Sequence, residues 1–191
     1  MRKTALTLLL IGIASAAALA GVKTESAGDP SFDFKTLKTW AWSESPGDFK
    51  VWVSSQTKPE PIKQRFEPMI FRVVNDELPK RGFPRAAEGA APDFFVTYWA
   101  LITTGMSAQT MGQFLPAVAN WGIPPFVPST QSFSVYPEGS LVLDITSAAT
   151  KNVVWRGLAQ SEMSLDRPDT EREKRLRDAV RDLLKKFPPK K

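Results

Sequence analysis

Three early stretches of the chain have the pattern of hydrophobic and polar residues that β-strands show. The segment Leu37–Ser43 alternates, with Trp40 and Trp42 on one face, and predicts a half-buried strand. A second short strand is expected at Phe49–Val53. The segment Pro92–Thr104 is rich in aromatic and β-branched residues, which predicts a long strand.

Two other stretches repeat hydrophobic residues at every third or fourth position, which is typical of helices. In the first, Pro61–Leu78, the internal Pro68 is expected to kink or split the helix, because its ring clashes with the preceding turn. The second runs from Thr170 to Phe187, and Thr170 with Glu173 offers a capping box. Its apolar stripe is formed by Leu176, Val180, Leu183 and Phe187. The basic and acidic residues between these positions alternate, which indicates a solvated helix face.

Two apolar strands separated by a polar turn are predicted between Glu138 and Ala159. One side of this hairpin is expected to face the core, with Leu141, Leu143 and Ile145 on the first strand and Val153, Trp155 and Gly157 on the second. A five-residue turn then places Asp144 directly opposite Arg156, whereas a three-residue turn makes them diagonal neighbours.

An arginine next to a carboxylate keeps it ionised. A catalytic acid or base instead needs a pKa near neutrality. We therefore interpret Asp144 and Arg156 as a structural pair, which contributes roughly 0.5 to 1 kcal/mol as cross-strand pairs do.

The order strand, helix, strand, strand, strand, helix predicts an α+β fold, with an antiparallel β-sheet and two α-helices packed on one face. The late strands are joined too tightly for helical crossovers, so they should pair antiparallel. Residues 21–35 are expected to form a flexible lead-in, and residues 36–191 a single domain.

The first twenty residues have the pattern of a secretory signal peptide. Arg2 and Lys3 precede the apolar stretch Ala5–Ala14, and Ala18-Leu19-Ala20 offers a cleavage site after Ala20. The most apolar later run, Phe94–Ile102, is half as long as the ~20 residues that a membrane span needs. We expect a periplasmic protein with no stable membrane span after cleavage. Because the chain contains no Cys, no lipid anchor is expected at the end of the signal.

The composition excludes several reaction classes, because none of the 191 residues is His or Cys. A Ser-His-Asp triad, a Cys-His pair, a typical zinc site and iron–sulfur clusters all need those residues. No cofactor and no metal are expected, and the protein is expected not to be an enzyme. The formal net charge of +5 either aids solubility or attracts anionic lipid or envelope polysaccharide, so peripheral membrane association stays open. Nucleic acid is not expected as a partner, because an exported protein rarely meets it.

A long stretch from Phe94 to Pro137 carries no charged residue. Its middle, Gly105–Ser132, mixes Gly and Pro with large apolar residues, and we take five of these as candidate binding residues: Met106, Met111, Phe114, Trp121 and Phe126. Long loops without secondary structure are often functional. This one is either a docking surface for a partner, a membrane or an apolar ligand, or it folds back to complete the core.

Four stretches of the sequence form a recognisable set: "FDFKTLKTWAW", "PDFFVTY", the hairpin "YPEGSLVLDI" with "VVWRG", and the closing "AVRDLLKKFPP". Together they resemble a known family, the domain of unknown function 4136. The resemblance implies a protein of the Gram-negative envelope with an α+β fold. Many relatives carry a lipoprotein Cys at the N-terminus, and this chain has none. The resemblance implies no activity and no site residues.

Three functions remain open at this point. The first is a non-enzymatic envelope protein that binds or scaffolds an unknown partner through Gly105–Ser132. The second is a carrier of an apolar or lipid-like periplasmic ligand. The third is a carboxylate-based hydrolase, for which Asp93, Glu138 and Asp144 are the candidate acids, and for which three acidic groups would have to converge in a cleft.

Overall fold

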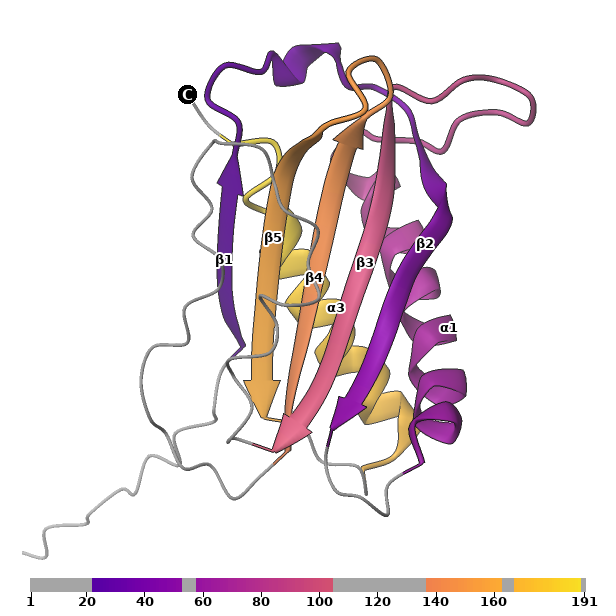
Figure 1. The fold of residues 1–191 in the computed structure, drawn as a ribbon, viewed down its shortest axis with the longest axis vertical. Helices are drawn as coiled ribbons and strands as arrows, with labels where there is room; N and C mark the ends of the chain where they lie inside the picture. The colour runs from indigo at the N-terminus through magenta and orange to yellow at the C-terminus, as the bar shows by residue number, and fades with distance from the viewer. Residues whose placement is uncertain (1–21, 53–57, 105–136, 163–166, 190–191) are drawn as a thin grey trace, which may run out of the picture.

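The computed structural model describes residues 22–52, 58–104, 137–162 and 167–189 (Figure 1). Within these residues, five strands form one sheet in the order β1-β5-β4-β3-β2. The strands are β1 (Lys23–Gly28), β2 (Trp40–Trp52), β3 (Phe94–Thr104), β4 (Pro137–Ser147) and β5 (Val153–Glu162). The helices α1 (Pro59–Glu77) and α3 (Asp169–Leu184) both lie on one face of the sheet (Figure 1). The predicted α+β fold is therefore confirmed.

One pair of strands corrects the prediction of an antiparallel sheet. Strand β2 runs parallel to β3, whereas the other neighbouring pairs are antiparallel. The reason is the connection, since α1 leads the chain from the end of β2 back to the start of β3. Such a strand–helix–strand crossover returns the chain in the same direction.

The segment expected to be a flexible lead-in contains the edge strand β1. All six residues of β1 pair antiparallel with β5, from Lys23 opposite Gln160 to Gly28 opposite Trp155. Further along, Asp33 accepts a hydrogen bond from the backbone N–H of Lys35 at the start of a short 3-10 turn. This part of the lead-in is thus ordered structure.

Strand β2 joins the two short strands expected at Leu37–Ser43 and Phe49–Val53 into one. Its pairing with β3 shifts register between Trp42 and Gly47, which marks a bulge. At Gly47 the two strands approach so closely that an added Cβ would overlap the backbone oxygen of Tyr98. Glycine is therefore required at this position.

Both helices differ in detail from the sequence prediction. Helix α1 is not split at Pro68, because its buried face packs on the sheet and holds the helix across the lost backbone hydrogen bond. The capping box at Thr170 and Glu173 does not form. Helix α3 starts two residues earlier than the box requires, with Pro168 at the N-cap position and no side-chain cap.

The hairpin of β4 and β5 has the register that a five-residue turn predicts, with Ile145 opposite Trp155. Past Trp155 a bulge shifts the pairing, so that Val154 joins the core in place of the expected Val153. The side chains of Ile145 and Trp155 are fully buried between the sheet and the helices. At the same end of the core, Phe187 lies 5.2 Å from the Trp155 ring.

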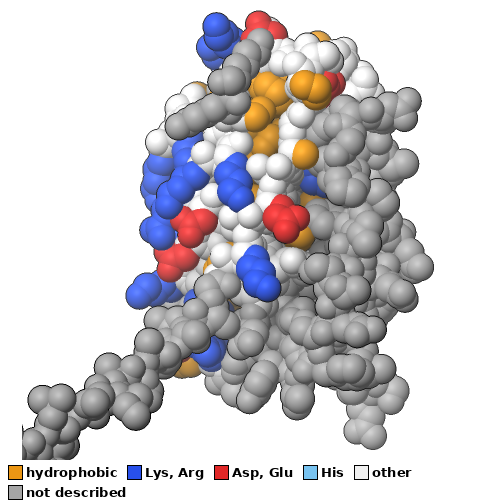
Figure 2. Space-filling view, turned by 90° about the vertical axis from the view of Figure 1, so that its left-hand side faces the viewer, with side chains coloured by type: hydrophobic (Ala, Val, Ile, Leu, Met, Phe, Trp, Pro, Cys, Tyr) orange, Lys and Arg blue, Asp and Glu red, His pale blue; other side chains and the backbone are white. Residues whose placement is uncertain are grey.

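Helices α1 and α3 are joined by ion pairs along their outer sides. Arg72 contacts Glu173 at 2.5 Å, and Arg177 contacts Asp76 at 2.9 Å. Figure 2, which views the molecule from the β1 side, shows Lys and Arg side chains standing beside Asp and Glu on the described surface. Within the described residues, no helix is long and apolar enough to cross a membrane.

Candidate binding pocket

A cavity lies between the sheet and α3, at the end of the sheet where β4 begins. Its origin is a patch of small side chains on the helix-facing side. Ala100, Leu141 and Ala159 form one cross-strand row, and Gly139 stands in the next. Helix α3 places Ala179 above them. The three alanines and the glycine leave a space of about 100 Å³ unfilled.

The inner walls of the cavity are apolar. Phe49 of β2 and Phe66 of α1 stack with their ring centroids 6.3 Å apart, and Ile70 and Leu176 complete the sides. Phe49, Phe66 and Ile70 are buried. The interior therefore favours an apolar group.

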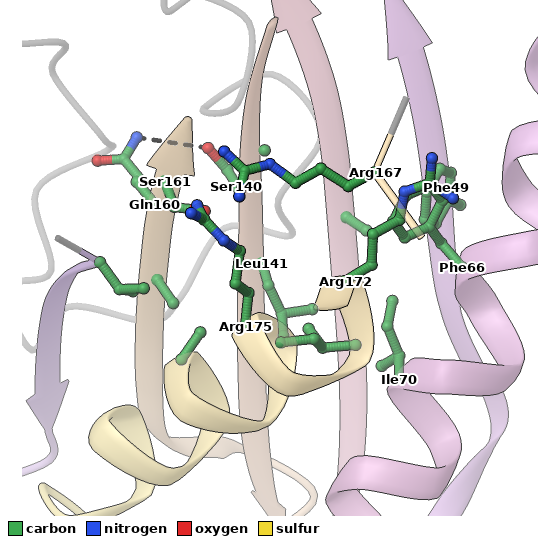
Figure 3. A pocket seen from close by; sticks show the side chains of 16 residues that line it. Phe49, Phe66, Ile70, Ser140, Leu141, Gln160, Ser161, Arg167, Arg172 and Arg175 are labelled. Carbon is green, nitrogen blue, oxygen red and sulfur yellow. Dashed lines mark hydrogen bonds between the residues drawn. The ribbon is translucent and has the colours of Figure 1, made fainter. Parts of the chain in front are cut away.

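Three arginines line the cavity: Arg167, Arg172 and Arg175. Figure 3 shows Arg167 and Arg175 reaching toward the ends of β4 and β5, whereas Arg172 turns toward Phe66. The Arg172 guanidinium lies 5.6 Å from the centroid of the Phe66 ring, in the position of a cation–π contact. Its side chain is only 5% exposed.

Two carboxylates of the first turn of α3 hold these arginines in place. Asp169 accepts hydrogen bonds from Arg172 at 2.7 Å and from Arg65 of α1 at 2.6 Å. The bond from Arg65 is the main reason that the pKa of Asp169 lies below its ordinary value. Glu171 accepts a hydrogen bond from Arg167 and lies 3.7 Å from Nε of Arg175. Neither carboxylate is among the residues that line the cavity.

The five binding residues predicted from the sequence, Met106, Met111, Phe114, Trp121 and Phe126, lie outside the described residues. The structure therefore brings none of them to the cavity, and the choice between a docking surface and a core segment stays a prediction. The lining of the cavity comes instead from β2 to β5, α1, α3 and Val22 and Arg167 beside them.

Asp144 and Arg156 lie on the opposite face of the sheet from the helices. They are directly opposite one another in the β4–β5 register. Arg156 donates two hydrogen bonds to the Asp144 carboxylate, at 2.5 and 2.6 Å, and Trp99 donates a third from Nε1 at 3.0 Å. Both partners are buried. The geometry is that of a satisfied, bidentate ion pair.

The other candidate acid with a described side chain, Asp93, also has a structural environment. Its carboxylate accepts hydrogen bonds from the backbone N–H groups of Thr39 and Lys38 and from the Thr39 hydroxyl. The Thr39 N–H is the main reason that the pKa of Asp93 is lowered. Within the described part of the chain, Asp and Glu do not form a group of three that could hold a metal.

The sequence pattern did not indicate a role for the three arginines, because Arg172 and Arg175 were assigned to a solvated helix face and Arg167 lies before the predicted helix. A signal was present in the spacing. The apolar stripe at Leu176, Val180 and Leu183, continued back by one turn, reaches Arg172. A charged residue in line with an apolar stripe indicates a position that is buried with a partner.

The sequence profile of a domain of unknown function, DUF4136, matches residues 24–189, which is most of the chain. The chain belongs to the DUF4136 family. This match confirms the resemblance that the four sequence stretches indicated. No protein of curated function matches the chain.

Solved structures similar to this DUF4136 chain include a DUF4136 family protein from Bacteroides thetaiotaomicron. It has 13% sequence identity and a TM-score of 0.51, and the alignment covers 88% of this chain and 96% of that one. At this identity the likeness shows the shared fold. A PelC dodecamer from Paraburkholderia phytofirmans aligns over 85% of this chain and 96% of its own, at 8% identity and a TM-score of 0.39.

Proposed function

We propose that this protein is a non-enzymatic binding protein of the bacterial cell envelope that carries a small apolar or lipid-like ligand in the cavity beneath α3. The observation that carries the proposal is the cavity itself, which opens to solvent through a polar mouth and is walled by buried aromatic and aliphatic side chains. Pockets that bind small molecules combine an apolar interior with a few polar groups at defined places.

Export to the envelope is the second part of the proposal. It is supported by the sequence of residues 1–20, which has a basic start, an apolar stretch and a small-residue cleavage site. A periplasmic location gives the cavity access to ligands that cross or leave the envelope.

The absence of catalytic groups at the cavity supports a binding role. Among the described residues that line it, there is no Asp or Glu, and the chain contains no His or Cys. Hydrolysis by paired carboxylates needs two acids on either side of the substrate. The candidate acids Asp93 and Asp144 are both held by hydrogen bonds elsewhere in the fold.

The volume of the cavity determines which small molecule is a suitable probe for a binding experiment. A cavity of 150 Å³ in another protein holds benzene, so about 100 Å³ encloses the end of an alkyl chain. Hexan-1-ol is therefore a suitable neutral probe, and each buried CH₂ should contribute about 0.8 kcal/mol. Titration followed by two-dimensional NMR should give saturable shifts of the amides of β3, β4, β5 and α3 near the cavity.

A cavity-filling variant gives the matched test. Ala159→Leu places three extra carbon atoms in the cavity and should abolish hexan-1-ol binding. It should leave the protein as stable or more stable, because an unfilled cavity costs about 24 cal/mol for each Å³. Ala87→Leu, at an exposed position outside the cavity, is the control and should bind like the wild type. The proposal fails if the wild type gives no saturable shifts, or if both variants bind equally.

Docking of an envelope partner is a second candidate function, favoured by the uncharged sequence of residues 94–137. It is tested by Trp121→Ala. A docking residue would lose crosslinking to the partner with almost no change in melting temperature. A core residue would instead cost about 3 to 5 kcal/mol of stability, and that result would exclude docking through Trp121.

A further inference from the structure

The charged side chains that line the described part of the cavity are all positive. Of the described residues that line it, three are arginines, and Asp and Glu are not among them. Two of the three, Arg167 and Arg175, are only partly buried, with side chains 34% and 37% exposed. They lie where a ligand enters, above a floor that is apolar.

Arg167 and Arg175 already hold one carboxylate between them. Glu171 accepts a hydrogen bond from Nη1 of Arg167, and the same oxygen lies 3.7 Å from Nε of Arg175. Within the described part of the chain, this approach is the one ion pair that Arg175 makes, and it is too long for a hydrogen bond. A guanidinium offers five N–H donors. Both arginines therefore keep donors for a second carboxylate.

The volume of the cavity limits the ligand. A cavity of 150 Å³ in another protein holds benzene, so about 100 Å³ takes the end of a short alkyl chain, on the order of six carbons in length, with its head group left at the arginines. A longer chain would carry its head past the arginines into solvent. A planar head suits the site best, because guanidinium groups bind carboxylates through parallel hydrogen bonds.

We infer that the cavity selects short-chain carboxylates, such as a six-carbon fatty acid, with the alkyl end beneath α3 and the carboxylate bound by Arg167 and Arg175. This inference rests on the proposed function, since it names the ligand class of the same cavity. Arg172, which pairs with Asp169 and lies over Phe66, forms the fixed wall beside the ligand.

Three six-carbon probes that differ only in the head group test the inference: hexanoate, hexan-1-ol and hexylammonium. In NMR titrations at low salt, hexanoate should bind about five- to tenfold more tightly than hexan-1-ol, and hexylammonium should bind most weakly. Added NaCl should weaken hexanoate binding and leave hexan-1-ol unchanged, because salt screens charges at an exposed mouth.

Variants of the mouth separate charge recognition from cavity filling. Arg167→Gln and Arg175→Gln should each reduce hexanoate affinity about fivefold toward that of hexan-1-ol. Glu171→Gln should increase hexanoate affinity, because it removes the carboxylate that competes for both arginines. The controls are Lys174→Gln and Asp178→Asn, which change the charge of the same helix away from the cavity and should have no effect.

The outcomes distinguish this inference from the proposed function. Equal affinity of hexanoate and hexan-1-ol in the wild type would overturn the inference and leave an apolar carrier standing. A loss of hexanoate binding in Glu171→Gln would also overturn the inference. If neither probe binds, the proposed function itself fails. Circular dichroism melting of each variant shows that a change in affinity does not come from unfolding.

Discussion

Breaking the buried pair of Asp144 and Arg156 should destabilise the protein far more than a surface ion pair would. The side chains are 2% and 5% exposed, and Arg156 binds the carboxylate with two hydrogen bonds at 2.5 and 2.6 Å. In Asp144→Asn, the Arg156 guanidinium stays buried without its counter-charge. In Arg156→Gln, the carboxylate stays buried with only the hydrogen bond from Trp99.

The size of the expected stability loss follows from the burial of Asp144 and Arg156. A cross-strand pair at a sheet surface contributes roughly 0.5 to 1 kcal/mol, which is the value that the sequence alone suggested. Removal of one partner of a buried pair costs about 3 to 5 kcal/mol, because an uncompensated charge remains in the interior. Each single substitution should therefore cost about 3 kcal/mol. The double change Asp144→Leu with Arg156→Met should return to within about 2 kcal/mol of the wild type, since no buried charge is left.

Urea unfolding followed by tryptophan fluorescence measures these differences. The control is the exposed pair of Asp178 and Arg181 on α3, which has a similar distance of 2.7 Å but side chains 38% and 48% exposed. Asp178→Asn and Arg181→Gln should each cost less than about 1 kcal/mol. Single losses at Asp144 and Arg156 no larger than those of the control pair would refute the reasoning from burial, and so would strict additivity in the double mutant.

Three further predictions concern other parts of the chain. Gly47→Ala should cost about 2 to 3 kcal/mol in urea unfolding, because the new Cβ overlaps the backbone of Tyr98; an unchanged midpoint would contradict the close approach of β2 and β3. Asp93→Asn should cost about 1 kcal/mol at pH 7. Because folding lowers the Asp93 pKa below its ordinary value of 3.8, this difference should be complete above about pH 4 and vanish as the pH falls further; a pH-independent difference would contradict the role of the charge. N-terminal sequencing of the exported protein should begin at Gly21 or within a few residues, and a protein that retains Met1 would exclude cleavage.

The elements that sequence reasoning predicted well are those whose faces differ in burial. The hairpin of β4 and β5 alternates between core and opposite face, so its pattern determined the strands and placed Asp144 and Arg156 on one face. The pattern left two turn lengths open, and the structure has the register in which the two residues are directly opposite. Strand β1 carries no such pattern. Its sequence "KTESAG" is polar and largely exposed or half-buried, and backbone pairing with β5 holds it. Hydrophobic periodicity cannot detect a strand of that kind.

The parallel pairing of β2 and β3 was missed for a different reason. The relative direction of two neighbouring strands depends on the segment that connects them. In the sequence, only the connections between the late strands are short enough to determine that direction. Helix α1 stands between β2 and β3, and the two strands of such a unit run parallel when they are neighbours. The same rule applied to the predicted helix would have allowed the parallel pair.

The cavity could not be predicted from any one segment, because its space comes from small residues on different elements. Ala100, Gly139, Ala159 and Ala179 are unremarkable in sequence, and they become neighbours only through the sheet register and the packing of α3. The burial of Arg172 could have been predicted more easily, since this residue continues the apolar stripe of its own helix.

The two faces of the β4–β5 hairpin are linked through its register. On one face, the register places Asp144 directly opposite Arg156, so that the two side chains form their ion pair. On the other face, the same register places Leu141 opposite Ala159 and so leaves the cavity open toward α3. A slip of one residue on β5 would turn its whole side-chain set over, and Ala159 would no longer stand opposite Leu141. The ion pair and the cavity therefore depend on the same alignment of β4 with β5, and a change of register would disrupt both.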